Sequence, residues 1–222
     1  MSDITVEQVK AGQAPYNRLF LAVYDQVIPF NYRLLWRCQP GQVLDLYNEH
    51  VSANHLDVGV ATGTILDHCT FPTSSPRLAL MDLNPNSLAV AAKRLTRYHP
   101  ETYLRNVLEP IEIAALPFDS VGLANLLHCL PGTMTTKRVV FENLKAVLNP
   151  GGTLFGCTVL SKGVKRSLPG RLGMAFSNAT RTFTNKEDDL DGLKRNLAEC
   201  FPESSVKVMG CVALFSARRG PS

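Results

Sequence analysis

The sequence lacks the features that mark several classes of protein. Its six cysteines are scattered and none belongs to a C-x-x-C pair, so neither a disulfide framework nor a zinc site is indicated. No apolar run reaches about 18 residues, the length of a membrane span, and the polar start MSDITVEQVK is unlike a secretory signal. We therefore expect buried free thiols, a reducing cytoplasmic location, no metal and no membrane partner.

Charge and composition exclude further classes. The net charge of +4 is too small to indicate nucleic-acid binding by itself. The hydrophobic fraction of 45% and the charged fraction of 19% are typical of a globular chain rather than a disordered one. A length of 222 residues is enough for one full-sized core. We expect a single domain over residues 1–222.

The first fifty residues have the spacing of helices. In residues 14–37, apolar and aromatic side chains recur at helical intervals, and Pro29 is expected to divide the run into two helices. Another short helix is expected over residues 41–51. Residues 1–50 are therefore predicted to form a helical cover over an α/β core at residues 51–222.

In this core, apolar strands alternate with helical patterns. Strands are expected at five places, residues 55–60, 77–83, 101–107, 119–128 and 152–160. Segments 85–98 and 135–148 each place their apolar residues on one helical face, and Asn84 followed by Pro85 is typical of a helix start. Such alternation predicts βαβ units and a parallel sheet.

The end of the chain follows another pattern. A helix near residues 186–200 precedes two apolar stretches, 205–210 and 212–219, with almost no linker between them. A parallel pair needs a long crossover, so these two strands must be antiparallel. The predicted fold class is α/β, with a mostly parallel sheet that ends in an antiparallel hairpin.

A glycine-rich turn follows the first strand, within HLDVGVATGTILD. A strand, a glycine turn and a helix together bring backbone N–H groups close to a ligand. The dinucleotide fingerprint G-x-G-x-x-G/A fails twice, at Ala61 and at Thr64. The spacing acid-x-G-x-G-x-G fits Asp57, Gly59, Ala61 and Gly63, with one glycine replaced by alanine.

The turn resembles that of the class I S-adenosylmethionine-dependent methyltransferases, and the resemblance covers nearly the whole chain. Asp82 in LALMDLNPNSL, the stretch LNPGGTLF and the C-terminal hairpin follow in that family's order. The resemblance implies a Rossmann-like sheet of seven strands with helices on both faces. It also implies that the turn holds the methionine half of S-adenosyl-L-methionine and that Asp82 binds the ribose hydroxyls.

The resemblance assigns the adenine end of the cofactor to nearby segments. Leu83 is expected in the same pocket. After the third strand the family usually places an acid that accepts from the adenine amino group, and Asn106 could accept that hydrogen bond without charge. Val107 and Leu108 would then flank the adenine ring, and the methyl group of Ala61 would displace the ligand slightly.

Candidate substrate residues follow from the same layout. His128 ends the fourth predicted strand, where it could act as a general base, and the alternative is a histidine that holds the loop or lines the pocket. Tyr16, Tyr24 and Trp36 of the cover are expected to contact substrate, unless they pack in the core. Segment 161–185 has five basic residues and no acid, and it is either a substrate lid or a solvated loop.

These observations favour a small-molecule methyltransferase, and the resemblance to compact stand-alone members of the family implies a role in secondary metabolism. One alternative is a protein of this fold that binds the cofactor but catalyses a cyclisation or rearrangement, or acts as a scaffold. RNA methylation rests only on the basic segment and is disfavoured, because no aromatic stacking pattern accompanies the charge. The oligomeric state, monomer or homodimer, stays open.

Overall fold

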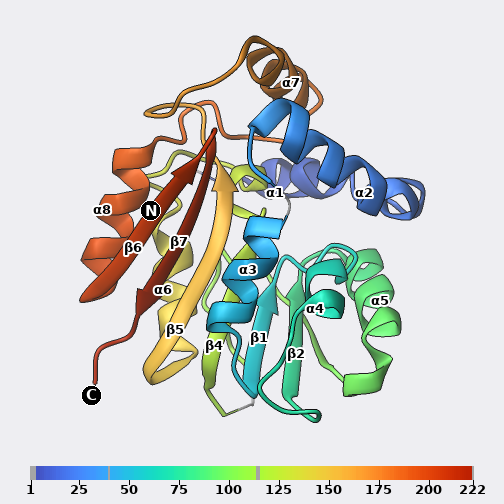
Figure 1. Ribbon diagram of the computed structural model, residues 1–222, viewed down its shortest axis with the longest axis vertical. Coiled ribbons are helices and arrows are strands. Elements are labelled where there is room, and N and C mark those ends of the chain that lie inside the picture. The colour runs from blue at the N-terminus through green and yellow to red at the C-terminus, as the bar shows by residue number, and fades with distance from the viewer. Residues whose placement is uncertain (1–3, 40, 114–115, 222) are drawn as a thin grey trace.

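A computed structural model of the chain describes residues 4–39, 41–113 and 116–221. Its centre is a seven-stranded sheet with the strand order β3-β2-β1-β4-β5-β7-β6 (Figure 1). The strands are β1 (Asn54–Val58), β2 (Arg77–Asp82), β3 (Glu101–Leu104), β4 (Phe118–Ala124), β5 (Leu148–Val159), β6 (Glu203–Met209) and β7 (Val212–Arg218). Strands β1 to β5 pair in parallel, whereas β7 is antiparallel to both β5 and β6. The predicted sheet with its terminal hairpin is confirmed.

Helices cover both faces of this sheet, as expected. One buried cluster includes side chains of α3 (Gly41–His50), α4 (Thr64–His68) and α5 (Pro85–Arg94). The other includes side chains of α6 (Arg138–Ala146) and α8 (Leu190–Cys200). Within α5, Asn84 accepts from the Asn86 N–H as the N-cap, and Pro85 takes the first helical position. The sequence signals for this helix start were therefore sufficient.

A helical cap lies at the carboxyl ends of the parallel strands (Figure 1). It contains α1 (Val6–Gln13), α2 (Arg18–Asn31), the π-helical turn η1 (Tyr32–Trp36) and α7 (Leu168–Ala179). The first three correspond to the predicted N-terminal cover. The fourth occupies Leu168–Ala179 of segment 161–185, so the middle of this segment is helical.

Pro29 does not divide the cover as expected. Helix α2 continues through it to Asn31, since a proline removes one backbone N–H and need not end a helix that tertiary contacts support. The helix changes form directly after α2, where the chain continues as the π-helical turn η1. This turn ends at Arg37, which has a left-handed φ of 52°. Residues 18–36 therefore form one continuous helical arm, α2 followed by η1, in place of two helices.

Smaller differences concern element ends and buried groups. Strand β4 stops at Ala124, and the predicted remainder forms the 3-10 turn η3 (Leu127–Cys129). All six cysteines are buried and free, as expected. Among the described residues, no helix is long and apolar enough to cross a membrane.

Candidate active site

The glycine turn joins β1 to α4 with three residues in the left-handed region. The φ angles are 74° at Gly59, 45° at Ala61 and 72° at Gly63. A Cβ atom on Gly59 would lie 2.9 Å from the Leu126 side chain, and one on Gly63 would lie 3.1 Å from the Cβ of Ala91. Both glycines are therefore required by packing as well as by conformation. Ala61 adopts the same conformation at a cost of about 1 kcal/mol.

Asp82 ends β2 beside this turn. Its Oδ1 accepts a hydrogen bond of 2.8 Å from the Asn84 N–H. Burial raises the pKa of Asp82 to about 6, although the N–H groups of Asn84 and Ala61 oppose the shift. A carboxylate that is desolvated and close to backbone donors is poised to accept hydroxyl hydrogen bonds from a ligand.

The first cavity lies over Asp82, between the sheet edge and the cover. Its walls include most residues that the resemblance assigned to the cofactor, namely Gly59, Ala61, Asp82, Leu83, Asn106 and Val107. Its roof comes from the cover, with Val9, Gly12, Gln13 and Tyr16. Acid, glycine turn and apolar side chains thus meet in one space, as a nucleoside-containing cofactor would need.

Two of the predicted adenine contacts differ in detail. The Asn106 Oδ1 accepts from the Leu108 N–H at 3.1 Å, and its Nδ2 donates to Glu109 Oε1 at 2.9 Å. The amide oxygen has a second lone pair for a ligand, but its orientation is set by this turn. Leu108 is absent from the cavity wall and packs against the core instead, because the turn directs it inward.

The cover is fastened on both sides of the glycine turn. On one side, Asn84 Nδ2 donates to the Tyr16 carbonyl oxygen at 2.9 Å. On the other, Asp25 accepts from Thr62 Oγ1 at 2.6 Å and from Arg94 Nη2 at 2.6 Å. Burial tends to raise the pKa of Asp25, yet the hydrogen bonds from Arg94 and Thr62 outweigh it and lower the pKa. Sequence reasoning missed this anchor, which has no local signature.

A second cavity, of about 530 Å³, adjoins the first. Side chains of α2, α3 and α4 form most of its apolar wall, including Ile28, Pro29, Val43, Leu44, Ile65 and Leu66. Asp57 and Gly63 of the glycine turn also line it. The two cavities share five residues, namely Tyr24, Gly59, Ala61, Ala124 and Asn125. They therefore meet at the turn.

Asn125 is a shared wall residue that the sequence reading missed. Its φ is 60°, a conformation that asparagine tolerates better than most residues. Its Oδ1 accepts a hydrogen bond of 2.6 Å from the Tyr32 hydroxyl. The sequence signal that could have identified Asn125 is its position directly after the buried strand β4.

Two tyrosines and a cysteine at the first cavity are hydrogen-bond donors at neutral pH. The Tyr16 hydroxyl lies 3.3 Å from Cys129 Sγ, and Tyr16 and Tyr24 pack with ring centroids 6.2 Å apart. Burial raises the pKa of both tyrosines and raises that of Cys129 to about 11. These groups can orient an acceptor atom, but none of them is ionised near pH 7.

Comparison with known proteins gives a consistent assignment. Residues 56–154 match a family described as "Methyltransferase domain". The chain is 43% identical over 212 residues to the demethylluteothin O-methyltransferase of Streptomyces thioluteus, covering 95% of this chain and 92% of that protein. It is 38% identical over 211 residues to the physcion biosynthesis cluster O-methyltransferase of Aspergillus chevalieri, covering 94% and 95%.

A solved structure supports the fold. That of DhpI, in complex with SAH, has a TM-score of 0.71 at 16% identity and covers 99% of this chain and 100% of DhpI. The chain belongs to the class I S-adenosylmethionine-dependent methyltransferases. Its cofactor is S-adenosyl-L-methionine, and the walls of the first cavity in this methyltransferase include Asp82, Gly59 and Ala61 of the turn, and apolar side chains.

His128 does not have the surroundings expected of a base in this methyltransferase. It is buried and lines neither cavity. Its Nδ1 accepts from the Val159 N–H at 3.1 Å, so the neutral ring holds its proton on Nε2. Burial, and next the charge of Lys137, lowers the pKa of His128 to about 3. This geometry favours the alternative in which the histidine holds the loop.

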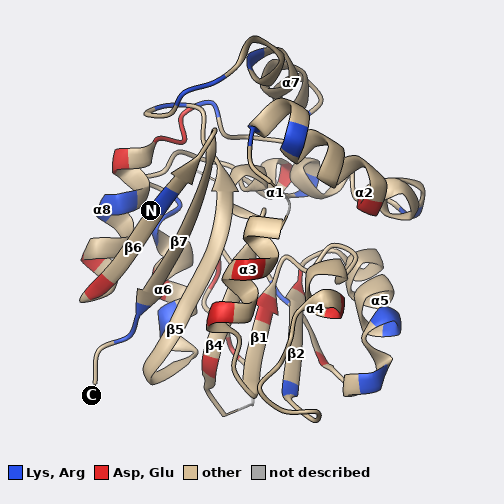
Figure 2. Ribbon diagram, in the orientation of Figure 1, with Lys and Arg blue, Asp and Glu red and all other residues tan. Residues whose placement is uncertain are grey.

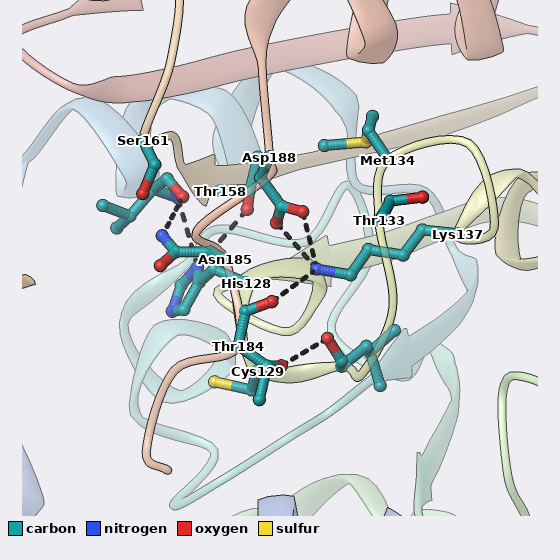
Figure 3. A network of polar contacts seen from close by, with 12 residues as sticks. His128, Cys129, Thr133, Met134, Lys137, Thr158, Ser161, Thr184, Asn185 and Asp188 are labelled. Atoms are coloured by element: carbon teal, nitrogen blue, oxygen red, sulfur yellow. Dashed lines mark hydrogen bonds and ion pairs between the residues drawn. The ribbon is translucent and has the colours of Figure 1, made fainter. Parts of the chain in front are cut away.

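Figure 3 shows the network that surrounds this histidine. Lys137 Nζ lies 2.8 Å and 2.7 Å from the two carboxylate oxygens of Asp188, and both side chains are fully buried. The Thr184 N–H donates to the His128 carbonyl oxygen at 2.8 Å, and Asn185 Nδ2 donates to the Val159 carbonyl oxygen at 2.8 Å. The network therefore joins η3, the end of β5 and the segment after α7.

Trp36 also differs from its expected role. It is 3% exposed, lies outside the walls of both cavities and packs on Phe183 with a centroid distance of 5.6 Å. Of the three aromatic residues assigned to substrate, only Tyr16 and Tyr24 line a cavity. Trp36 is a core residue, because η1 turns its side chain toward the sheet side of the cap.

Proposed function

We propose that this methyltransferase transfers a methyl group to an oxygen atom of a small molecule in secondary metabolism. The observation that carries the proposal is the second cavity, an apolar space of about 530 Å³ that meets the cofactor cavity at the glycine turn. The names of the relatives from Streptomyces thioluteus and Aspergillus chevalieri support oxygen as the accepting atom.

Within the first cavity, we assign each end of the cofactor to particular residues. Asp82 would accept hydrogen bonds from the ribose hydroxyls, and Leu83 and Val107 would contact the adenine ring. Gly59 and Ala61 would contact the methionine half there, and Gly63 and Asp57 would complete the turn from the side of the second cavity. When bound, S-adenosyl-L-methionine supplies an electrophilic methyl group on its sulfonium.

The accepting hydroxyl would enter from the second cavity at the shared wall. Tyr24 and Asn125 line both cavities and would orient the acceptor oxygen for an in-line approach. A tyrosine with a raised pKa and an amide do not remove a proton at pH 7. Acceptors that ionise on their own near neutral pH, such as acidic phenols or enols, therefore fit this wall best.

Mass spectrometry of reaction mixtures tests the proposal. The purified protein is incubated with methyl-labelled S-adenosyl-L-methionine and a panel of phenols, enols, amines and thiols. Label is expected only in hydroxyl acceptors, with formation of one S-adenosylhomocysteine per product. Cofactor binding without label in any acceptor would contradict methyl transfer, and label in amines alone would contradict the oxygen assignment.

The cellular location and assembly are also proposals. We infer a cytoplasmic enzyme, which six buried cysteines without disulfides support. Whether it acts as a monomer or a homodimer is decided by sedimentation equilibrium.

A further inference from the structure

Helix α7 exposes its large apolar side chains, whereas an ordinary surface helix buries them. Its large apolar residues Leu168, Leu172 and Phe176 are 68%, 66% and 70% exposed. They recur every four residues, so they form one ridge along the helix. We call Leu168, Leu172 and Phe176 the outer ridge. An ordinary surface helix buries such residues and exposes its small and polar ones.

The inner side of α7 is made of small residues that fix this orientation. A Cβ atom on Gly170 would lie 2.5 Å from the Leu35 carbonyl oxygen, and one on Gly173 would lie 2.8 Å from Leu35 Cδ1. Met174 on the same side is 2% exposed. The two glycines allow α7 to approach Leu35 of η1 closely. A rotation of α7 that turned the outer ridge inward would break this contact.

Exposed basic residues lie on α7 and in the segments next to it. Segment 161–185 has no acidic residue, and Lys165, Arg166, Arg171 and Arg181 are exposed in it. Figure 2 shows blue segments on α7 and on the connection that leads to it, without red ones. The fifth basic residue of this segment, Lys162, differs because its Nζ forms an ion pair with Glu187 Oε2 at 2.5 Å.

We propose that the outer ridge of α7 binds the surface of an anionic lipid bilayer. Apolar side chains on one helical face with basic residues beside them are the combination that lies in the interface of a charged membrane. A convex ridge also needs no complementary groove when its partner is a bilayer. A second copy of the chain fits less well, because the same basic residues would face each other across the contact.

This contact is peripheral and needs no spanning helix, so it revises the expectation that no membrane partner exists. It does not depend on methyl transfer, since neither the ridge nor the basic residues line the two cavities. Failure of either proposal therefore leaves the other unaffected.

Vesicle flotation of the full chain tests the proposal. Vesicles of phosphatidylcholine mixed with phosphatidylglycerol are compared with vesicles of phosphatidylcholine alone, at low and at high salt. The protein is expected to float with the anionic vesicles only, and less at high salt. Absence of binding to anionic vesicles, or equal binding to both kinds, would overturn the proposal.

Matched variants locate the contact. The double variant Leu172→Ser/Phe176→Ser is expected to lose flotation, whereas Leu104→Ser, at a 50% exposed leucine on β3, is not. Arg171→Glu should weaken binding roughly fivefold or more, and Arg195→Glu, at an exposed position of α8, should not. Circular dichroism verifies that each variant is folded. Equal losses in ridge and control variants, or sedimentation showing a dimer that the ridge variant abolishes without vesicle binding, would refute the lipid contact.

Discussion

The carboxylate of Asp82 is expected to make cofactor binding depend on pH. Its pKa is raised to about 6 by burial, so below this pH the group becomes protonated in the free protein. A protonated carboxyl is a weaker acceptor for two ribose hydroxyls than a carboxylate. The dissociation constant for S-adenosylhomocysteine should therefore be nearly constant from pH 7 to 8 and rise as the pH falls through about 6.

Replacing Asp82 with Asn removes the charge but keeps a side-chain oxygen. This oxygen can still accept the hydrogen bond that the Asn84 N–H donates to Asp82 Oδ1 at 2.8 Å. Hydrogen bonds to a charged group contribute about 1.5–3 kcal/mol, so Asp82→Asn should weaken binding roughly ten- to hundredfold at pH 7.5. The pH dependence should disappear in the variant, because its amide does not titrate.

The sign of the stability effect provides an independent readout. A carboxyl whose folded pKa lies above its unfolded value of 3.8 stabilises the fold at low pH, and this contribution is lost as the pH rises through about 6. At pH 7.5 the variant should therefore be at least as stable as the wild type.

Isothermal titration calorimetry from pH 5 to 8 measures binding, thermal unfolding measures stability, and Asp191→Asn on the exposed side of α8 is the matched control. An unchanged dissociation constant in Asp82→Asn, or a pH dependence that survives in it, would refute the role given to this carboxylate.

Three further predictions concern the surroundings of the site. Turnover should show no titration of a histidine between pH 6 and 8, and a titration that disappears in His128→Leu would show that His128 is the base after all. The same variant should lower the free energy of unfolding by about 1–3 kcal/mol, because the Val159 N–H loses its acceptor. Lys137→Met should destabilise the fold by about 3–5 kcal/mol in urea unfolding, and adding Asp188→Leu should recover most of it; equal losses in single and double variants would contradict the pairing. Gly63→Ala should cost more than about 1 kcal/mol, whereas Ala61→Gly should change stability by less than about 1 kcal/mol in the same assay; similar effects at both positions would contradict the packing argument.

The sheet could be predicted because its signals are local. Alternating apolar strands and amphipathic helices follow from the periods of the two structures, and the short linker before β7 excludes a parallel pair. The glycine turn was likewise visible, since its spacing reflects left-handed backbone at Gly59 and Gly63. Each of these inferences needed only residues that are close together in the chain.

The parts that were missed depend on residues far apart in the chain. Asp25 and Arg94 belong to different elements, as do Lys137 and Asp188, and no periodic pattern joins either pair. His128 was placed at the right edge of the sheet, but the hydrogen bond to its Nδ1 comes from β5, which the sequence around it does not reveal. Position along a strand predicts which edge a residue occupies, and it does not predict which way its ring points.

The shared wall between the cavities follows from the way in which the cover is fastened. Asn84 binds the carbonyl of Tyr16 on the cofactor side, and Asp25 binds Thr62 on the other. Tyr24 lies between Tyr16 and Asp25 in the sequence, within α2, and it lines both cavities. Because one arm closes two spaces, a change in either anchor should alter cofactor and substrate binding together. The cover therefore contributes to the walls of both cavities, and this is why we expect the two binding steps to respond together.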